Sequence, residues 1–458
     1  MNSTSKLRLA FYGDDFTGST DALEQLTLAG CRCILFLEPP TPAQLAKFKN
    51  LQAIGIAGMT RSLPTAAMER VLRPAYEKIK ALGPRHVHYK VCSTFDSSPK
   101  TGSIGRVIDI AETVFPARFV PLVVAAPALG RYCVFGNLFA RFGIGSDGAI
   151  HRLDRHPSIS RHPITPMREA DLRLHLAKQM RGRIELFDVL KLRLPFKKAR
   201  SILSKMASDG ARVVLFDVLS ESELEMIGRL IDKQASGGNS LFSVGSSGIE
   251  MALTAHWNRG SKRVVKLRKA SAVNQLLVGS GSCSPVTLQQ IQYAVANGFA
   301  EVALDANGIA DAKVEALISA AVSKTIKFLR AGRSVIVHTT RGGSDRKLAA
   351  KLKGRSAEIL GSALGKILRD TIEQHGVQRL CVAGGDTSSF AARALGIEAL
   401  EMIAPLTPGA PLCRAIAPGT ALDGLELVFK GGQVGAENYF ECVKAGTDLN
   451  RRTRRERT

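Results

Sequence analysis

Residues 7–21 read Leu-Arg-Leu-Ala-Phe-Tyr-Gly-Asp-Asp-Phe-Thr-Gly-Ser-Thr-Asp, an apolar run that ends in a glycine and two carboxylates. The run Leu7–Tyr12 has the length and composition of a buried strand, and Thr17–Leu28 has the apolar spacing of a helix. Ligands of parallel α/β sheets bind beyond the carboxyl ends of the strands, where Asp14 and Asp15 stand. One polar residue of this turn could simply cap the helix, but capping does not explain a pair of carboxylates. We therefore expect a functional site here.

Short apolar runs alternate with amphipathic stretches through most of the chain, which predicts crossover connections in a mostly parallel sheet. The strands expected in the first half are Leu7–Tyr12, Cys31–Leu37, Ala53–Ala57, Val87–Val91, Phe119–Ala125, Arg183–Asp188, Arg212–Asp217 and Leu241–Val244. The helices expected there are Thr17–Leu28, Ala66–Leu82, Ile104–Val114, Ala170–Met180, Ala199–Ser208 and Glu221–Gln234. The segment Gly130–Pro166 shows little periodicity, and we expect an irregular functional stretch there.

A polar, basic, glycine-containing stretch at Asn258–Arg263 separates a second series of alternating elements from the first. The strands expected in this second series are Gln275–Val278, Val302–Leu304, Val335–His338 and Leu380–Ala383. The helices expected there are Val286–Ala296, Val314–Leu329 and Ile359–His375. We therefore predict two α/β domains, residues 1–260 and 270–450, each with a mostly parallel sheet flanked by helices, and an active site in the cleft between them. Residues 451–458 form a basic tail that we expect to be disordered.

The composition is that of a folded globular protein with a large excess of positive charge. Of the 458 residues, 45% are hydrophobic, which excludes disordered and low-complexity classes. With 63 Lys and Arg against 40 Asp and Glu, the net charge is +23, which predicts attraction to anions such as nucleic acid or an acidic or phosphorylated small molecule. A basic solvated surface would explain the charge equally well. Aromatic residues make up 6% and do not interleave with the basic runs, so single-stranded nucleic acid is disfavoured.

The eight cysteines do not form a C-x-x-C pair or a zinc spacing, and we predict no metal ligands in the protein. No apolar run approaches 18 residues, and the first residues are polar. We therefore expect a cytoplasmic protein without a membrane partner.

A second polar cluster follows the predicted strand at Val87–Val91. Lys90 precedes Cys92-Ser-Thr-Phe-Asp-Ser-Ser98, so a cation and several hydroxyl groups are offered together to an acidic, hydroxylated ligand. Clusters of Ser, Thr and Asp are also common in ordinary loops, which leaves that alternative open.

Three glycine-rich turns in the second half resemble phosphate-binding turns. Gly279-Ser-Gly-Ser-Cys-Ser284 and Gly384-Gly-Asp-Thr-Ser-Ser389 each follow a predicted strand, and Lys430-Gly-Gly-Gln-Val-Gly435 follows the apolar run Leu425–Phe429. Free backbone N–H groups at such strand–helix turns favour phosphate. Each turn alone is weak, but three in one domain favour a nucleotide. No Walker A sequence is present, and a dinucleotide cofactor of the Rossmann type is disfavoured.

Taken as a set, these sequences resemble the four-carbon acid sugar kinase family. The matching stretches are Asp14–Gly18, Lys90–Ser98, Gly384–Ser388 and Lys430–Gly432. The resemblance implies an N-terminal domain that binds the sugar acid and a C-terminal domain that binds ATP. It assigns Asp15, Arg61, Lys90, Ser93 and Thr94 to the acid site, and we expect Asp14 and Thr17 to take part there as well. It assigns Ser282, Gly361, Gly384, Gly385, Asp386, Thr387 and Gly431 to the nucleotide site, and we expect Ser280 to take part there as well.

The function expected from this resemblance is transfer of the γ-phosphate of ATP to a terminal hydroxyl of threonate, erythronate or a 3-oxo-tetronate, with Mg²⁺ neutralising phosphate charge. We predict that Asp15 is the base that accepts the hydroxyl proton, and that Asp14 has a structural role, bonding backbone near the helix start. The strand ends Tyr-Gly-Asp-Asp where Ala-Asp-Asp is usual, and the last turn reads Lys-Gly-Gly-Gln where several members have Lys-Ser-Gly-Asn. These departures leave the acid open.

Two alternatives remain at this point. One is an aldolase, isomerase or hydrolase of sugar acids, which would leave the glycine-rich turns unexplained. The other is a nucleotide- or nucleic-acid-binding regulator, which would leave Asp14, Asp15 and the Lys90 cluster unexplained. We expect small-molecule partners, no nucleic acid, and leave open a homodimer.

Overall fold

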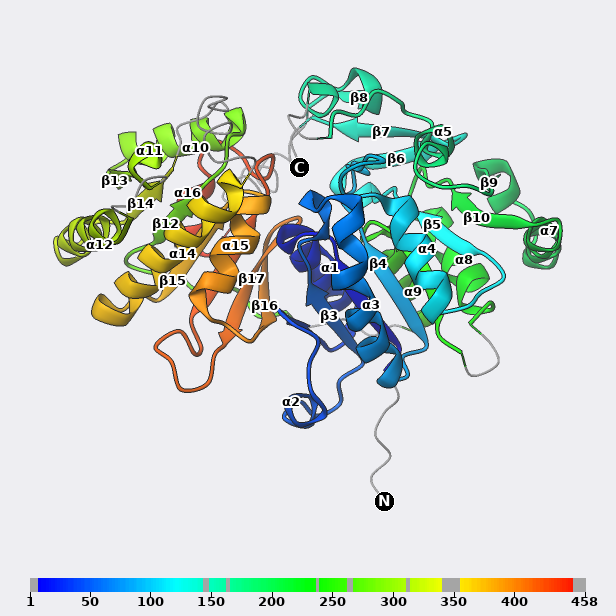
Figure 1. The fold of residues 1–458 in the computed structure, drawn as a ribbon, viewed down its shortest axis with the longest axis horizontal. Helices are drawn as coiled ribbons and strands as arrows, with labels where there is room; N and C mark the ends of the chain where they lie inside the picture. The colour runs from blue at the N-terminus through cyan, green and yellow to red at the C-terminus, as the bar shows by residue number, and fades with distance from the viewer. Residues whose placement is uncertain are drawn as a thin grey trace. The chain divides into compact units, whose positions relative to one another are not determined.

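The computed structural model describes residues 7–142, 148–161, 165–235, 239–261, 267–309, 314–339 and 355–447. The chain divides into two compact units (Figure 1): the N-terminal unit, with described residues 7–261, and the C-terminal unit, with described residues 267–447. Both are α/β units with mostly parallel strands, so the predicted fold class is confirmed. The basic tail at 451–458 lies outside the described residues.

The central sheet of the N-terminal unit is parallel. Its strand order is β2 (Cys33–Phe36), β3 (Ala53–Ala57), β1 (Leu9–Gly13), β4 (His86–Lys90), β11 (Leu241–Gly245), β5 (Val120–Val123), β10 (Ala211–Phe216) and β9 (Arg183–Phe187). The inner strands carry few polar side chains because both faces of a parallel sheet are covered.

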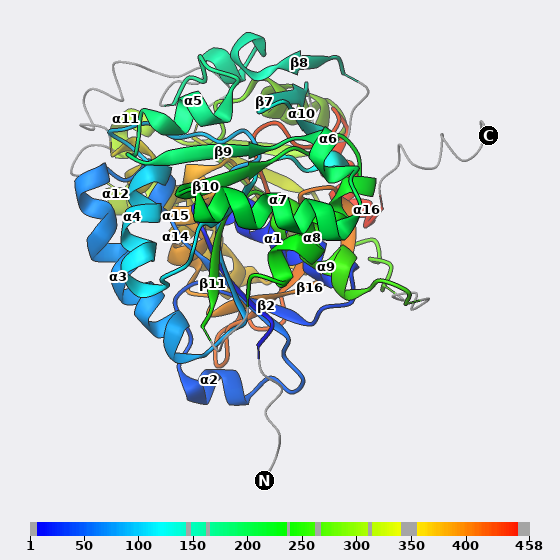
Figure 2. The ribbon, with the colours of Figure 1, turned by 90° about the vertical axis from the view of Figure 1, so that its right-hand side faces the viewer.

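The helices of this unit lie on both faces of the sheet. Their bounds are α1 (Phe16–Leu28), α2 (Pro42–Ala46), α3 (Thr65–Ala81), α4 (Ile104–Val114), α5 (Leu172–Ala177), α6 (Val189–Leu192), α7 (Phe196–Ser208), α8 (Ser222–Asp232) and α9 (Gly248–Trp257). Helices α3 and α4 pack together on one face, and α1, α8 and α9 cover the other (Figure 2).

The strand order places a topological switch point between β1 and β4. After β1 the chain passes through α1 toward β2, whereas after β4 it passes through α4 toward β5 on the other side. Right-handed crossovers in opposite directions put their helices on opposite faces, and ligands of such sheets bind at the carboxyl ends of the two strands beside the switch point. Asp14, Asp15 and Lys90 stand at that end of the sheet.

The expectation of an irregular stretch at Gly130–Pro166 is wrong for much of its length. Strands β6 (Arg131–Val134), β7 (Asn137–Arg141) and β8 (Ile150–Arg152) form a small antiparallel sheet. The turn between β6 and β7 is held by Asp217, whose carboxylate accepts the N–H groups of Phe135 and Gly136 at 2.6 and 2.9 Å. Strands of three to five residues are too short to be recognised by pattern.

The C-terminal unit has strand order β13 (Ala300–Ala303), β14 (Val335–His338), β12 (Leu277–Ser280), β15 (Arg379–Ala383), β18 (Glu426–Lys430), β17 (Ala410–Ile416) and β16 (Ala399–Thr407). The first five are parallel, and β17 is antiparallel to both of its neighbours in this order. Its helices are α10 (Pro285–Ala296), α11 (Ala306–Ile309), α12 (Val314–Arg330), α14 (Ser356–His375), α15 (Asp386–Leu395) and α16 (Tyr439–Ala445). The antiparallel pair β16 and β17 was not predicted.

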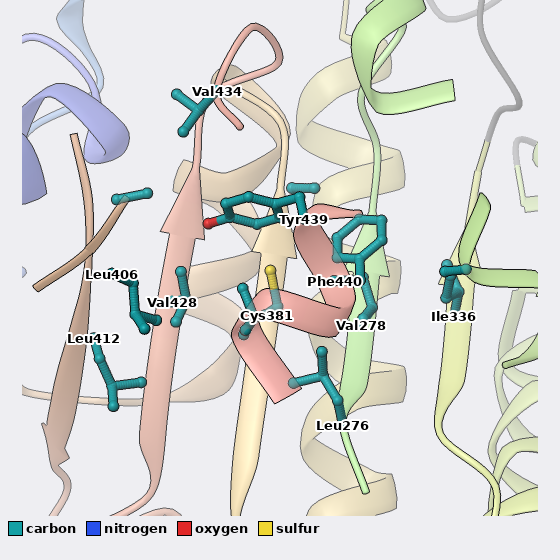
Figure 3. Packing of buried hydrophobic residues seen from close by; sticks show 14 of the residues in the cluster. Leu276, Val278, Ile336, Cys381, Leu406, Leu412, Val428, Val434, Tyr439 and Phe440 are labelled. Atoms are coloured by element: carbon teal, nitrogen blue, oxygen red, sulfur yellow. The ribbon is translucent and has the colours of Figure 1, made fainter. Parts of the chain in front are cut away.

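A second switch point lies between β12 and β15, which are neighbours. The chain leaves β12 through α10 toward β13 and leaves β15 through α15 in the opposite direction. The apolar core beneath α16 is shown in Figure 3, where Tyr439 and Phe440 lie over strands that carry Val278, Cys381 and Val428. This packing fixes the ends of β12, β15 and β18 relative to one another. Within the described residues, no helix has both the length and the apolar character needed to cross a bilayer.

Candidate functional site

The first site lies at the switch point of the N-terminal unit, where the backbone itself ties three strand ends together. Gly13 and Lys90 are register partners on adjacent strands, and the Asp14 N–H donates to the Lys90 carbonyl at 2.8 Å. Arg61 belongs to the short 3₁₀ helix η1 (Thr60–Ser62) after β3, and its N–H donates to the Asp14 carbonyl at 3.1 Å. The predicted site residues Asp14, Asp15, Arg61 and Lys90 are therefore brought together.

Asp15 is the N-cap of α1. One carboxylate oxygen accepts the Gly18 N–H at 2.8 Å, and the other accepts the Thr17 hydroxyl at 2.7 Å and the Arg61 guanidinium at 2.5 Å. Burial raises the pKa of Asp15, but Arg61, the Thr17 hydroxyl, Lys90 and the Gly18 N–H together hold it below its usual range. Asp15 is thus an ionised carboxylate engaged in fixed contacts.

Asp14 occupies a different environment from its neighbour. Its side chain is buried, and in the described part of the chain its Oδ1 has no hydrogen-bond partner. Burial raises the pKa of Asp14 to about 7, with Asp15 adding to the rise and Arg61 and Lys90 opposing it. The expectation that Asp14 bonds backbone near the helix start is wrong. Strand β1 ends at Gly13 and α1 begins at Phe16, so the capping position falls on Asp15.

Lys90 is a fully buried cation in a ring of carboxylates. Its Nζ lies 3.3 Å from Asp21 Oδ2 and donates to the Val91 carbonyl at 3.1 Å. Burial lowers the pKa of Lys90, but the charges of Asp21, Asp14 and Asp15 raise it by more than burial lowers it. The pKa therefore lies above the ordinary lysine value. A Cβ at Gly18 would lie 2.5 Å from Asp15 Oδ1 and 3.1 Å from Lys90 Nζ, which explains why this helical position carries no side chain.

The turn after β4 supplies hydroxyl groups, as predicted. Ser93 and Thr94 are buried, and the Thr94 hydroxyl donates to Asp96 at 2.9 Å. Among the described residues the Ser93 hydroxyl has no partner, so it is free to bond a ligand. Phe95 has a φ of 59°, which turns the chain sharply at this point.

Sequence reasoning did not assign three charged residues of this cluster: Asp21, Asp96 and Arg131. Asp21 follows Gly18 by three residues on α1, and that helical spacing could have identified it. Arg131 starts β6 and is buried, its Nη1 donating to the carbonyls of Leu129 at 3.1 Å and Arg141 at 3.0 Å. Burial lowers the pKa of Arg131, and the nearby Asp96 and Asp21 oppose that change. No local pattern marks it.

The second site lies at the switch point of the C-terminal unit, where the three glycine-rich turns converge. A Cβ at Gly281 would lie 2.2 Å from Thr387 Cγ2, and one at Gly432 would lie 3.0 Å from Ser282 Oγ. Gly384 has a φ of 137° and lies in contact distance of the Gly281–Ser282 peptide. Three turns that are separate in sequence therefore form one cluster, and glycines occupy the positions where they approach most closely. The turns are 279–284, 384–389 and 430–435.

This cluster offers unused donors of the kind that phosphate requires. Helix α15 starts after Gly385 with no side-chain cap, so N–H groups of its first turn are open. Ser280 is fully buried, and its hydroxyl has no partner in the described residues. Asp386 is the first residue of α15, but its side chain lies outside the described part. Gly431 belongs to the third turn, which the Val434 N–H closes by donating to the Gly431 carbonyl at 3.2 Å.

Gly361 was predicted to line the nucleotide site, and the structure places it at a helix–helix contact. It lies in α14, where a Cβ would meet Phe390 Cβ at 2.8 Å and the Thr387 carbonyl at 2.9 Å. The side-chain-free position thus lets α14 approach the first turns of α15. No group of three or more His, Cys, Asp or Glu side chains suited to a metal ion occurs in the residues that the structure describes.

Comparisons with known proteins agree with this two-part arrangement. A family model described as the sugar-binding N-terminal domain matches residues 9–253, and one described as the nucleotide-binding C-terminal domain matches residues 277–440. The chain is 44% identical over 452 residues to a 3-oxo-isoapionate kinase of Paraburkholderia graminis, covering 96% of this chain and 94% of that one.

More distant relatives extend the likeness. The chain is 28% identical over 439 residues to a 3-oxo-tetronate kinase of Pseudomonas savastanoi pv. phaseolicola, covering 94% and 95% of the two chains. A solved structure from Salmonella typhimurium LT2 superimposes with a TM-score of 0.75 at 25% identity over 96% of this chain and 99% of that one. The chain therefore belongs to the four-carbon acid sugar kinase family, whose members join a sugar-binding N-terminal domain to a nucleotide-binding C-terminal domain.

Proposed function

We propose that this protein is an ATP-dependent kinase that phosphorylates a terminal hydroxyl of a 3-oxo sugar acid of the tetronate or isoapionate type. The observation that carries the proposal is that the chain has two switch-point sites of complementary chemistry. One combines carboxylates with Arg61 and Lys90, and the other combines glycine-rich turns with unpaired donors. The names of the relatives at 44% and 28% identity support the substrate class.

In the acid site, the cations bind the substrate carboxylate and the hydroxyl groups orient its chain. Arg61 is the more accessible cation, with 15% of its side chain exposed, whereas Lys90 acts from within the cluster. The Ser93 hydroxyl has no partner among the described residues, and Thr17 and Thr94 hold the carboxylates of Asp15 and Asp96 in place. A charge-assisted hydrogen bond is stronger than a neutral one, so loss of Arg61 should weaken binding of the acid more than binding of ATP.

The chemical step needs one carboxylate that accepts the proton of the attacking hydroxyl. As the hydroxyl oxygen bonds to the γ-phosphorus, the bond from that phosphorus to the leaving oxygen of ADP breaks, and the hydroxyl proton passes to the base. The sequence predicted Asp15 for this role. The geometry favours Asp14, because it has an unpartnered oxygen and a pKa raised to about 7 by burial, whereas both oxygens of Asp15 are engaged.

In the nucleotide site, the backbone donors after Gly281, Gly384 and Gly431 and the hydroxyls of Ser280, Ser282 and Thr387 bind the phosphates. Mg²⁺ enters as MgATP, held by the phosphates and neutralising their charge. Transfer requires that the acceptor hydroxyl reach the γ-phosphate during turnover. The excess of positive charge attracts both anionic reactants.

The proposal is tested by measuring ADP release from MgATP with a panel of acids: 3-oxo-isoapionate, 3-oxo-tetronate, threonate and erythronate. We expect turnover with at least one 3-oxo acid and a 1:1 ratio of ADP to phosphorylated acid. ADP release that is independent of any acid, or conversion of an acid without ATP, would overturn the kinase assignment in favour of a nucleotidase or a sugar-acid lyase or isomerase. ATP binding without turnover, together with salt-sensitive retention on DNA, would favour a regulator.

We propose a cytoplasmic location on chemical grounds. The cytoplasm supplies ATP, and all eight cysteines are free thiols. A homodimer stays a prediction, which light scattering of the purified protein tests.

A further inference from the structure

Lys430 is a buried lysine that has no counter-ion among the described residues. It ends β18, and its side chain is completely inaccessible to solvent. Its Nζ donates to the Thr287 hydroxyl at 2.9 Å and lies 5.4 Å from the centre of the Tyr439 ring. Within the described residues no carboxylate forms an ion pair with it. A buried charge without a partner is strongly disfavoured, so burial favours the neutral form of the amine.

Lys90 shows by contrast how the chain treats a lysine that stays charged. Both lysines end a parallel strand beside a switch point, and both are buried. Lys90 has Asp21 at 3.3 Å and two further aspartates nearby, and its pKa lies above the ordinary lysine value. Burial lowers the pKa of Lys430 to about 7, with only Cys381 opposing the change.

Among the residues that the structure describes, no carboxylate acts on Lys430 from the elements packed around it. Cys381 of β15 is the titratable neighbour, and burial raises the pKa of its thiol to about 12, so it is neutral. Helix α10 contains no charged residue, and it presents its positive N-terminal end through Thr287, its third residue. Helix α16 contributes the Tyr439 ring to the surroundings of Lys430. The carboxylate of Glu441 on the same helix interacts electrostatically with Lys444.

The hydrogen bonds of Lys430 connect it directly to the glycine-rich turns. Its carbonyl accepts the Gly384 N–H at 3.0 Å, which joins the second and third turns. The Thr287 hydroxyl that accepts from Nζ donates in turn to the Gly432 carbonyl at 3.1 Å. The amine thus lies behind the turn that we assign to phosphate.

We propose that binding of a nucleotide's phosphates in the C-terminal unit is coupled to uptake of one proton by Lys430. The inference rests on the proposed nucleotide site. In the free protein the amine is largely neutral at slightly alkaline pH. When the phosphates occupy the turns, their negative charge favours the ammonium form, and the amine takes a proton from solvent. Lys430 does not touch the ligand, and it acts as a buried counter-charge behind the turn.

Calorimetry of MgADP binding to the full chain tests this coupling. Titrations at pH 8 in buffers of different ionisation enthalpy report the number of protons exchanged. We expect uptake that approaches one proton at pH 8 and falls toward zero below pH 6, where the free amine is already charged. The phosphate groups of ADP titrate near pH 6 and would release protons on binding to a basic site, which is the opposite sign.

Two variants separate the coupling from a structural role. Lys430→Met keeps the volume, and we expect it to abolish the uptake and to weaken MgADP binding at least tenfold, while raising the melting temperature of the nucleotide-free protein at pH 7. Lys327→Met removes an exposed lysine of α12 and should leave uptake and affinity unchanged.

The outcomes distinguish this inference from the proposed function. Absence of any MgADP binding to the unaltered protein would overturn both. Binding without proton uptake at pH 8, or uptake that persists in Lys430→Met, would overturn only the role of Lys430. A lower melting temperature of Lys430→Met without nucleotide would also contradict it, because that result marks a purely structural lysine.

Discussion

At the scale of single residues, Asp14 and Asp15 show how neighbouring carboxylates acquire different properties. Asp15 accepts bonds from Gly18, Thr17 and Arg61 and stays ionised, whereas burial raises the pKa of Asp14 to about 7. The ideal pKa of a general base lies near the working pH. Adjacent residues can differ this much because one sits at the helix cap and the other is buried at the strand end.

This difference predicts unequal effects of two matched substitutions. Asp14→Asn should lower kcat by roughly 10²–10⁴-fold, the usual contribution of a general base. Asp15→Asn keeps a capping oxygen but loses the charge facing Arg61, so it should mainly raise KM for the acid. Steady-state kinetics with MgATP saturating make the comparison. Loss of kcat in Asp15→Asn with retention in Asp14→Asn would return the base role to Asp15.

The pH profile tests the same assignment. A base must be deprotonated, so kcat/KM for the acid at saturating MgATP should rise with pH and level off above about 7, the pKa to which burial raises Asp14. The residual activity of Asp14→Asn should lack this rise. An unchanged profile in Asp14→Asn would show that another group titrates.

Arg61 and Lys90 give a third prediction at this scale. Arg61→Ala should raise KM for the acid far more than KM for ATP, because its guanidinium lies in the N-terminal unit beside Asp15. Lys90→Met should do the same and also lower stability, since Asp21 would be left buried without its partner. Equal changes in both KM values would count against the assignment to the acid site.

At the scale of elements, the start of α1 is both a cap and part of the site. Gly18 faces Asp15 and Lys90 so closely that a methyl group cannot be added without displacing them. Gly→Ala within a helix normally stabilises by about 1 kcal/mol. We expect Gly18→Ala to lower the melting temperature instead and to raise KM for the acid.

A matched control distinguishes damage to the site from loss of a cap. Thr41 caps the short helix α2 through a capping box, with the Gln44 N–H donating to its hydroxyl at 3.2 Å. Thr41→Ala removes about 1 kcal/mol of capping but should leave KM unchanged. If Gly18→Ala, like Thr41→Ala, changed stability but left KM for the acid unchanged, the start of α1 would have no role in binding.

At the scale of the whole molecule, each unit carries its own switch-point site, so the two ligands should stabilise independently. A ligand that binds only the folded state adds about 2.7 kcal/mol at a hundred times its Kd. MgATP and the acid should each raise the melting temperature, and Gly384→Val should abolish only the MgATP effect. Absence of a shift with millimolar MgATP would contradict the nucleotide site, and loss of both shifts would indicate unfolding.

Much of the architecture was predictable because it depends on local pattern. Ala53–Ala57, Ile104–Val114 and Val335–His338 have the expected bounds, since buried strands and amphipathic helices each have a characteristic period. Strands β6 to β8 and the pair β16 and β17 were missed. Strands β6 to β8 are only three to five residues long, and the antiparallel pairing of β16 with β17 is a tertiary property that a local pattern does not specify.

The sequence by itself determined the fold class, the family resemblance and the polar residues at the ends of β1 and β4, because strand–turn–helix patterns and short sequence matches are local properties. Only the tertiary structure decided which carboxylate caps α1, that Asp21 accompanies Lys90, that Gly361 packs between helices, and that Lys430 has no counter-ion in the described part of the chain. These properties depend on burial and on neighbours distant in sequence. Lys90 and Lys430 occupy the same kind of strand end, and the groups that the fold places around each lysine determine whether its charged or its neutral form is favoured.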